Sequence, residues 1–238
     1  MEQYSNIGLI DSVEPMGLVD GPGIRFVVFM KKCKLRCLFC HNPETWNCNE
    51  GNSITTEELI KKIHKFHNYY KDGGVTFSGG EPLLQKYFLI EMLKKCHMIN
   101  LHTAIDTAGV GDGDYDEILK HTDLVILDIK AYKEEDYVKM TGQTMAEFNE
   151  FVKALNKNNN KLWLRQVIVP GINDTEEYIL GLKEYIKRFK NVEKVELLPY
   201  HLYGVSKYEK LGIPYRLKEV PPMDMEKLDK LNSLLQEN

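Results

Sequence analysis

The chain has 238 residues, of which 43% are hydrophobic and 28% are charged. This balance excludes an intrinsically disordered chain and a chain dominated by membrane-spanning segments. The formal net charge of −4 provides no general attraction to nucleic acid or to anionic lipid, so we expect neither as a partner. The length suits one α/β domain with a sizeable core, and we expect a single domain over residues 1–238.

The amino-terminal residues and the cysteines both indicate a reducing compartment. Glu2 stands where a signal peptide carries positive charge, and no apolar stretch of the required length follows. We therefore expect a cytoplasmic protein. Five cysteines are present, an odd number, and three of them fall within eight residues, which is unlike a disulfide framework. Clustered thiolates in such a compartment indicate a metal site.

Two strand–helix units are predicted in the first part of the chain. Residues 24–30 are apolar and either β-branched or aromatic, which is typical of a buried strand. Thr55 has the spacing of a capping box and begins a helix that we expect to end at the glycine pair 73–74. Residues 75–78 then predict a short strand, and residues 82–96 a helix with proline at its start.

Four further strands and the helical patterns between them complete the predicted fold. The strands are expected at residues 101–106, 124–129, 162–169 and 195–198. Residues 156–161 predict a polar turn, and residues 207–222 a long loop. About six strands that alternate with helices predict a parallel sheet, either curled into a barrel or open and doubly wound. Because six units are too few for a closed eight-stranded barrel, we expect a partial (β/α)6 barrel, an incomplete TIM barrel.

The cysteine-rich segment after the first predicted strand carries the strongest chemical signal. Cys33, Cys37 and Cys40 are separated by three and two residues, so one loop can ligate three irons of a [4Fe-4S] cluster. The fourth iron then stays open to a substrate. A structural zinc site is the alternative, with Cys48 or His41 as its fourth ligand, but the chain has no second pair of closely spaced cysteines. The triad therefore favours an iron–sulfur cluster over zinc.

Several polar groups stand at or directly after the ends of predicted strands. They are Gly79, Gly80 and Glu81, Asp106 with Thr107, Asp128 with Lys130, and His201. Ligands bind at the carboxyl ends of strands in α/β folds, so we expect these groups to face the cysteine loop. Ordinary turns would account for each group taken alone. Arg165 lies inside an otherwise apolar strand, where an unpaired charge is costly, so we expect it to face an acidic group or a ligand.

The sequence resembles the radical S-adenosylmethionine (SAM) superfamily, whose signature is this cysteine spacing with an aromatic residue, here Phe39, before the last cysteine. Further motifs, in the same order over nearly the whole chain, narrow the resemblance to the pyruvate formate-lyase activating enzymes of that superfamily. The motifs are DGPGIR at 20–25, CHN at 40–42 with TW at 45–46, and LLPYH at 197–201. Together they are far more specific than the cysteine triad.

This resemblance implies an activity and a set of site residues. A [4Fe-4S] cluster on the triad cleaves SAM reductively, which yields methionine and a 5′-deoxyadenosyl radical that abstracts hydrogen from a glycine Cα of pyruvate formate-lyase. The implied contacts to SAM are Phe39, Cys40, His41, Gly79, Gly80, Glu81, Asp128, Ile129, Lys130, Arg165 and His201. The implied ligands of a monovalent cation, Na⁺ or K⁺, are Asp106, Thr107, Ile126 and Asp128, with Asp20 approaching the glycine loop. A flavodoxin or ferredoxin is the expected electron donor, and the enzyme is expected to be a monomer.

Three alternatives stay open at the level of sequence. An activase of another glycyl radical enzyme often carries a cysteine-rich insert, whereas only Cys48 lies between Cys40 and Gly79 here. The same core also serves radical SAM enzymes that act on small molecules. A zinc-binding interaction module is the alternative outside enzymes. The sequence predicts no role for Cys48 or Cys96.

Overall fold

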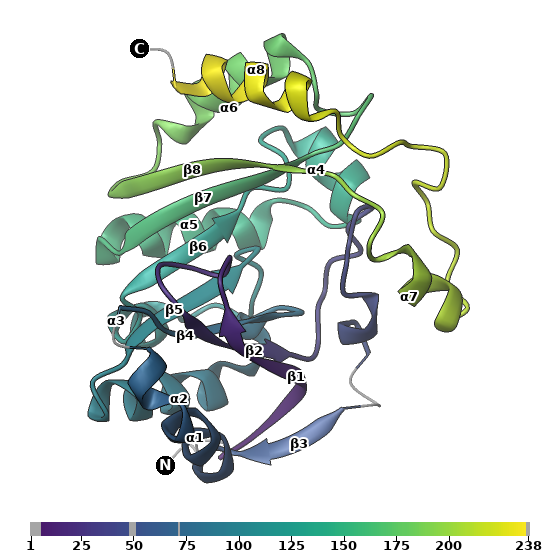
Figure 1. Cartoon of the computed structure of the whole chain (residues 1–238). Helices are drawn as coiled ribbons and strands as arrows, with labels where there is room; N and C mark the ends of the chain where they lie inside the picture. The colour runs from purple at the N-terminus through teal and green to yellow at the C-terminus, as the bar shows by residue number, and fades with distance from the viewer. Residues whose placement is uncertain (1–5, 48–50, 71, 237–238) are drawn as a thin grey trace.

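An eight-stranded sheet is the centre of the fold, which a computed structural model describes for residues 6–47, 51–70 and 72–236 (Figure 1). The parallel strands are β2 (Arg25–Met30), β4 (Gly74–Gly79), β5 (His102–Thr107), β6 (Leu124–Asp128), β7 (Lys161–Ile168) and β8 (Val192–Pro199). They confirm the six predicted strands, each within a few residues of its expected bounds. Two antiparallel strands, β1 (Ile7–Gly17) and β3 (Asn52–Thr55), extend the sheet beyond β2.

The order of the strands distinguishes a barrel from a doubly wound sheet. The order is β3-β1-β2-β4-β5-β6-β7-β8, so every parallel strand lies beside the next parallel strand in the chain. Right-handed crossovers that all step in one direction place their helices on one face of the sheet, whereas a doubly wound sheet reverses direction. The fold is therefore α/β with the winding of the predicted partial barrel.

The helices of the described residues connect successive strands or follow the last one. They are α1 (Thr56–Lys65), α2 (Lys86–Met98), α3 (Asp116–Lys120), α4 (Glu134–Thr141), α5 (Ala146–Asn158), α6 (Glu176–Ile186), α7 (Val205–Lys210) and α8 (Met225–Gln236). Short 3₁₀ turns lie at η1 (Pro43–Thr45), η2 (His67–Tyr69) and η3 (Pro82–Gln85). In the part of the chain that the structure describes, no helix combines the length and the apolar character that a bilayer crossing needs.

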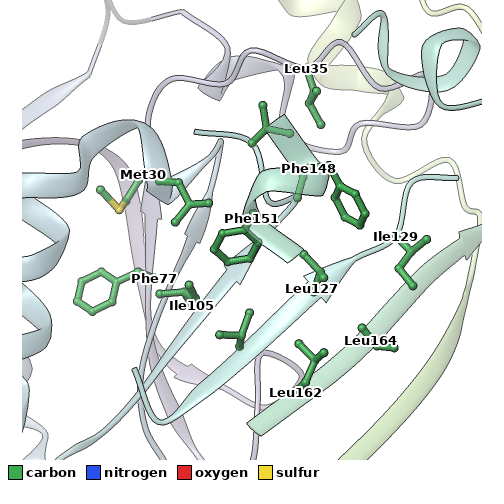
Figure 2. Packing of buried hydrophobic residues seen from close by; sticks show 14 of the residues in the cluster. Met30, Leu35, Phe77, Ile105, Leu127, Ile129, Phe148, Phe151, Leu162 and Leu164 are labelled. Carbon is green, nitrogen blue, oxygen red and sulfur yellow. The ribbon is translucent and has the colours of Figure 1, made fainter. Parts of the chain in front are cut away.

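Side chains on the two faces of the parallel strands belong to different clusters. The face turned toward the helices carries the large core, and Figure 2 shows Phe148 and Phe151 of α5 packed near Leu127 of β6. The opposite, inner face carries a small separate cluster that contains Ala104 and Ile126. Because side chains alternate along a strand, the residues two positions after these, Asp106 and Asp128, also belong to the inner face.

The structure corrects the extent of both predicted helices in the first part of the chain. The predicted capping box is confirmed, since Thr55 accepts a hydrogen bond from the backbone of Glu58 and the Glu58 side chain returns one. The predicted helix end at 73–74 is wrong, because Phe66 already leaves the helical conformation (φ −110°, ψ 9°). The helix predicted from residue 82 begins as the 3₁₀ turn η3, and α2 starts only at Lys86.

Two predicted loops are also wrong in part. The turn predicted at 156–161 is shorter, because α5 continues until Asn159 adopts the left-handed conformation (φ 63°), which asparagine tolerates at a helix end. The loop predicted at 207–222 overlaps α7. This short helix is held by tertiary contacts, since Lys207 binds the side chains of Asn42 and Glu44. Propensity alone does not predict such a helix.

The antiparallel strands are the main elements that the sequence did not reveal. Pro15 lies within β1, and proline is unfavourable inside a central strand because it lacks a backbone donor. The structure resolves this conflict, since β3 pairs only with residues 7–10 of β1 and leaves the proline on a free edge. The strand β3 has four residues, two of them exposed and polar, which is too short for a recognisable alternation.

Candidate active site

One cavity at the carboxyl ends of the parallel strands brings most of the predicted site residues together. It is lined by Cys33, Phe39, Cys37, Cys40, His41, Gly79, Gly80, Asp106, Thr107, Asp128, Lys130 and Arg165, among others. The expected convergence of strand ends on the cysteine loop is thus observed. Five predicted residues of the described chain do not line this cavity, namely Asp20, Glu81, Ile126, Ile129 and His201.

The cysteine segment is held between two helices. After β2 it passes α4, where Arg36 donates its backbone N–H to Thr141 (2.8 Å) and Leu38 donates to Met140 (2.9 Å). Figure 1 shows the segment rising toward α4 and then descending beside α7. There Tyr208 donates its hydroxyl to the carbonyl of Cys40 at 3.0 Å. The loop geometry is therefore fixed by protein contacts on both sides of the triad.

The three thiols lie in surroundings that disfavour a bare thiolate. Burial raises the pKa of Cys33 to about 12 and the pKa of Cys37 to about 11. Burial also raises the pKa of Cys40, although hydrogen bonds from the Asn42 backbone and the Trp46 side chain oppose the rise. A cationic group nearby favours the thiolate in such positions, and iron supplies that charge. The donor set therefore fits an iron–sulfur cluster.

The structure gives no separate support to the zinc alternative. Within residues 6–47, 51–70 and 72–236, no three His, Cys, Asp or Glu side chains are grouped as ligands of one metal ion. Cys48, the possible fourth ligand of the zinc alternative, lies outside the described residues. His41 instead stacks on His201, with ring centres 3.9 Å apart and planes 11° apart, and its Nε2 lies 3.1 Å from the carbonyl oxygen of His201.

The glycine pair packs directly against the cysteine segment. Gly80 and Glu81 donate their backbone N–H groups to the carbonyls of Met30 (2.8 Å) and Lys32 (2.7 Å). A Cβ atom on Gly79, whose φ is +106°, would lie 2.3 Å from the Met30 nitrogen, and one on Gly80 would lie 2.2 Å from the Lys32 oxygen. Glycine is therefore required by the close approach of two backbones, while both residues still face the cavity.

The carboxylate of Glu81 joins the ends of β4 and β5. It is fully buried and accepts hydrogen bonds from the Thr107 hydroxyl, from the backbone of Ala108 (2.9 Å) and from the backbone of Leu83 (3.2 Å). Burial raises the pKa of Glu81 to about 7 against the effect of these donors. Its oxygens are thus used by the protein, so the expected contact to SAM would have to come from its backbone.

Two carboxylates and two cations lie together on the inner face of the sheet. Asp128 accepts a hydrogen bond from Lys130 at 2.6 Å. Asp106 accepts one from Ser78 at 2.8 Å, and its Oδ2 atom lies 3.9 Å from Nη1 of Arg165. Burial, followed by the charge of Asp128, raises the pKa of Asp106 to about 6. The predicted acidic partner of Arg165 is therefore present.

The cations of this group are held in the charged state. Burial alone would lower the pKa of Lys130, but Asp128 and Cys37 raise it above its usual value. The Lys130 ammonium also lies 5.6 Å from the ring centre of Phe39. Arg165 reaches Glu196 with its Nε at 3.4 Å and donates to the carbonyl of Val19. It thereby connects the site to the turn that contains Asp20.

Asp20 lies in a turn above the inner face of the sheet. Its carbonyl accepts a hydrogen bond from the Thr76 hydroxyl at 2.7 Å. Burial raises the pKa of its carboxyl, and Arg165 and Arg25 oppose this rise. Two other predicted residues, Ile126 in the middle of β6 and Ile129 just after it, are buried, and their side chains pack in hydrophobic clusters.

Sequence reasoning missed three residues of the site. Ser78 binds Asp106, and the signal was its position directly before the glycine pair at the end of a strand. Trp46 lines the cavity and bonds to Cys40, whereas the sequence identified it only as part of the TW motif. Tyr208 binds the backbone of Cys40 from a region predicted as a loop, and no sequence signal identified it.

Comparisons with known proteins agree with this site. A family model described as the radical SAM superfamily matches residues 27–182. The pyruvate formate-lyase-activating enzyme of Clostridium pasteurianum is 54% identical over 233 residues, which covers 97% of this chain and 98% of that protein. The enzyme of the same name from Staphylococcus epidermidis is 44% identical over 229 residues, with 92% and 91% covered.

The solved structures add a likeness of fold. A crystal structure of a domain of a pyruvate-formate lyase-activating enzyme from Bacteroides vulgatus has a TM-score of 0.56 to this chain, at 23% identity. The alignment covers 68% of this chain and 92% of that one. The family match and the identities over nearly the full length carry the assignment. The chain belongs to the radical SAM superfamily and, within it, to the pyruvate formate-lyase-activating enzymes.

Proposed function

We propose that this enzyme activates pyruvate formate-lyase by forming a glycyl radical on it. The observation that carries the proposal is the convergence of three buried thiols with charged strand-end residues in one cavity of a radical SAM chain. When bound there, a [4Fe-4S] cluster and SAM supply a 5′-deoxyadenosyl radical, which takes a hydrogen atom from a glycine Cα. The protein binds, orients and shields these groups.

We assign the cluster to Cys33, Cys37 and Cys40. Their three positions in one cavity leave one iron without a cysteine ligand from the triad. The hydrogen bonds of α4 and α7 to the loop hold this arrangement in place. Phe39 is nearly fully buried between the ligands and excludes water from one side of the triad.

We assign SAM to the remainder of the cavity. Its carboxylate fits Lys130 and Arg165, whose charges are retained despite burial. Its amino group fits the backbone of the Gly79–Gly80 turn, which lines the cavity beside the triad. The stacked rings of His41 and His201 offer a flat surface to the adenine. The other proposed contacts to SAM are the backbones of Glu81 and Ile129 and the residues Phe39, Cys40 and Asp128.

A monovalent cation is proposed beside Asp106 and Asp128. Burial raises the pKa of Asp106, and Asp128 raises it further, so a bound cation would relieve the repulsion between these carboxylates. Thr107 and the carbonyl of Ile126 are the other proposed oxygen ligands, since hard oxygen donors suit such an ion. The Thr107 hydroxyl donates to Glu81 and accepts from the backbone N–H of Gly109 at 2.9 Å, so one lone pair is left for this role.

The partner glycine loop is proposed to enter beside Asp20, whose turn is tied to the site through Arg165. A flavodoxin or ferredoxin is the proposed electron donor, and the relatives' names identify pyruvate formate-lyase as the proposed substrate protein. We further propose that the enzyme acts as a cytoplasmic monomer in anaerobic metabolism, with a single domain over residues 1–238.

Anaerobic activation of pyruvate formate-lyase tests this function. Reconstituted enzyme is mixed with SAM, a reductant and pyruvate formate-lyase, and electron paramagnetic resonance (EPR) should detect a glycyl radical on the partner. Omission of SAM, or substitution of the partner's glycine by alanine, should remove the signal. A radical on a different glycyl radical enzyme, with none on pyruvate formate-lyase, would assign the chain to another activase.

A further inference from the structure

A second pocket adjoins the cavity that holds the triad. It is lined by Lys31, Arg36, Pro43, Glu44, Trp46 and Leu211, among others. Trp46 lines this outer pocket and the cavity of the cysteines at the same time. The indole of Trp46 is therefore shared by the proposed cluster site and the outer pocket.

Trp46 is joined to the triad by hydrogen bonding and by ring contacts. Its side chain bonds to Cys40, which opposes the rise in the pKa of that thiol. The ring of Tyr208 meets it edge-on at 5.8 Å, and the Tyr208 hydroxyl binds the carbonyl of Cys40 at 3.0 Å. On the outer side, the guanidinium of Arg36 lies 4.8 Å from the centre of the indole. The pocket thus lies one side chain away from a proposed cluster ligand.

The charges around the outer pocket are mostly neutralised within the protein. Lys31 pairs with Asp11 at 3.2 Å, and Lys207 pairs with Glu44. These two pairs leave no net charge. The lysine that lines the pocket, Lys31, and the lysine that pairs with its Glu44 are therefore both neutralised.

Two exposed arginines are the exception. Among the described residues, Arg36 and Arg216 have no carboxylate within ion-pair distance, and the guanidinium of Arg216 instead donates to the carbonyl of Arg36. This positive excess stands on a chain whose formal net charge is −4. A local positive patch on an acidic chain steers negatively charged partners to one place.

We propose that this electron-entry face, formed by Arg36, Trp46, Leu211 and Arg216, docks the protein that reduces the cluster. The partner is a small acidic protein with a one-electron cofactor. The two arginines complement its negative rim, and Leu211, 42% exposed, supplies an apolar contact. In the docked complex one electron leaves the partner's cofactor and enters the cluster, and no bond, proton or group is transferred. This inference rests on the proposed function, in which the triad holds a cluster that a flavodoxin or ferredoxin reduces.

Charge reversal at Arg216 tests the docking face. The rate of cluster reduction is measured anaerobically by absorbance, once with reduced flavodoxin and once with photoreduced 5-deazariboflavin, a neutral small molecule. We expect Arg216→Glu to slow reduction by flavodoxin about tenfold at low ionic strength and much less at high salt, with no change for the small molecule. Arg216→Lys, which retains the charge, should restore the rate.

The matched control is Lys190→Glu, which makes the same change of charge at an exposed residue before the amino end of β8. Equal flavodoxin rates in the Arg216→Glu and Lys190→Glu enzymes would overturn the docking face. A slower rate with the small molecule as well would also overturn it, because the cluster itself would then have changed. Pyruvate formate-lyase is absent from these measurements, so failure of the proposed function would appear only in the separate glycyl radical assay.

Discussion

The two faces of the parallel sheet bury very different side chains. Along β5 the neighbours Ala104, Ile105 and Asp106 alternate between them, so an apolar side chain faces the helices and the carboxylate faces inward. The helix-facing side is packed with rings and aliphatic chains (Figure 2). The inner side holds Arg165 against Asp106 and Glu196. The two faces therefore have different roles: the helix-facing side stabilises the fold, and the inner side holds charged groups in fixed positions.

The inner face also buries a charge far from the cysteines. Arg25 is fully buried there, and its guanidinium donates to the Thr76 hydroxyl (2.8 Å) and to the carbonyl of Val75 (2.6 Å). Burial lowers the pKa of Arg25 to about 10. A protein that needed only stability would fill this space with apolar groups. Substitutions on the helix-facing side should therefore change the free energy of unfolding, and substitutions at the site should change cluster content or activity.

Loss of one cluster ligand should have the largest effect. We expect Cys37→Ala to abolish cluster assembly and glycyl radical formation, measured by iron content and EPR, because two thiols cannot hold the cluster. Cys96→Ala is the control, because this fully buried thiol of α2 packs in the core. It should keep normal iron content. Equal loss of iron in both variants would contradict the assignment of the cluster to the triad.

Removal of a large ring from the helix-facing side should reduce stability without changing the site. Phe148 is fully buried against the sheet, so Phe148→Ala should lower the free energy of unfolding by about 3–5 kcal/mol. Urea denaturation of the cluster-free protein measures it, and Met98→Ala, at a residue 81% exposed, should stay within about 0.5 kcal/mol of wild type. At permissive temperature the Phe148 variant should still assemble its cluster.

The same contrast explains what could be predicted from the sequence. The parallel strands were predicted because residues such as Val125 and Leu127 form short apolar runs, which both layers of a barrel require. The cavity was predicted because parallel strands end at one edge, so Asp106 and Asp128 had to lie near each other. Such rules depend on local pattern and topology alone.

The remaining features depend on contacts between distant residues. Tyr208 reaches Cys40 across 168 positions, and nothing near it in the sequence indicates this contact. The strand β1 was not predicted because it contains Pro15. The energetic cost of a proline in a strand depends on whether a neighbouring strand needs the missing N–H donor, which the sequence does not show. Glu81 was expected to bind SAM directly, yet its carboxylate binds Thr107 and two backbone groups. A sequence motif therefore predicts where a residue lies more reliably than it predicts which groups its side chain contacts.

The buried carboxyl of Glu81 should make the stability of the protein depend on pH. Its folded-state pKa of about 7 exceeds the ordinary value of 4.5, so between these values the folded protein holds a proton that the unfolded chain has lost. The stability of the cluster-free protein should therefore fall as the pH rises from 4.5 to 7, by on the order of 1–3 kcal/mol from this group. Urea denaturation at several pH values should show a shallower decline for Glu81→Gln. Identical slopes would refute the assignment.

The smallest change in stability should come from removing one buried hydroxyl, that of Tyr137, on the helix-facing side. The hydroxyl of Tyr137 is buried and has no hydrogen-bond partner among the described residues, whereas the equally buried hydroxyl of Tyr200 binds Tyr215. Tyr137→Phe should therefore stabilise the cluster-free protein by about 1 kcal/mol, and Tyr200→Phe should destabilise it by a similar amount. Urea denaturation of both variants measures the pair. If both substitutions destabilise the protein equally, the Tyr137 hydroxyl has a hydrogen-bond partner in solution. The surroundings of this hydroxyl would then be polar, and not apolar as assigned here.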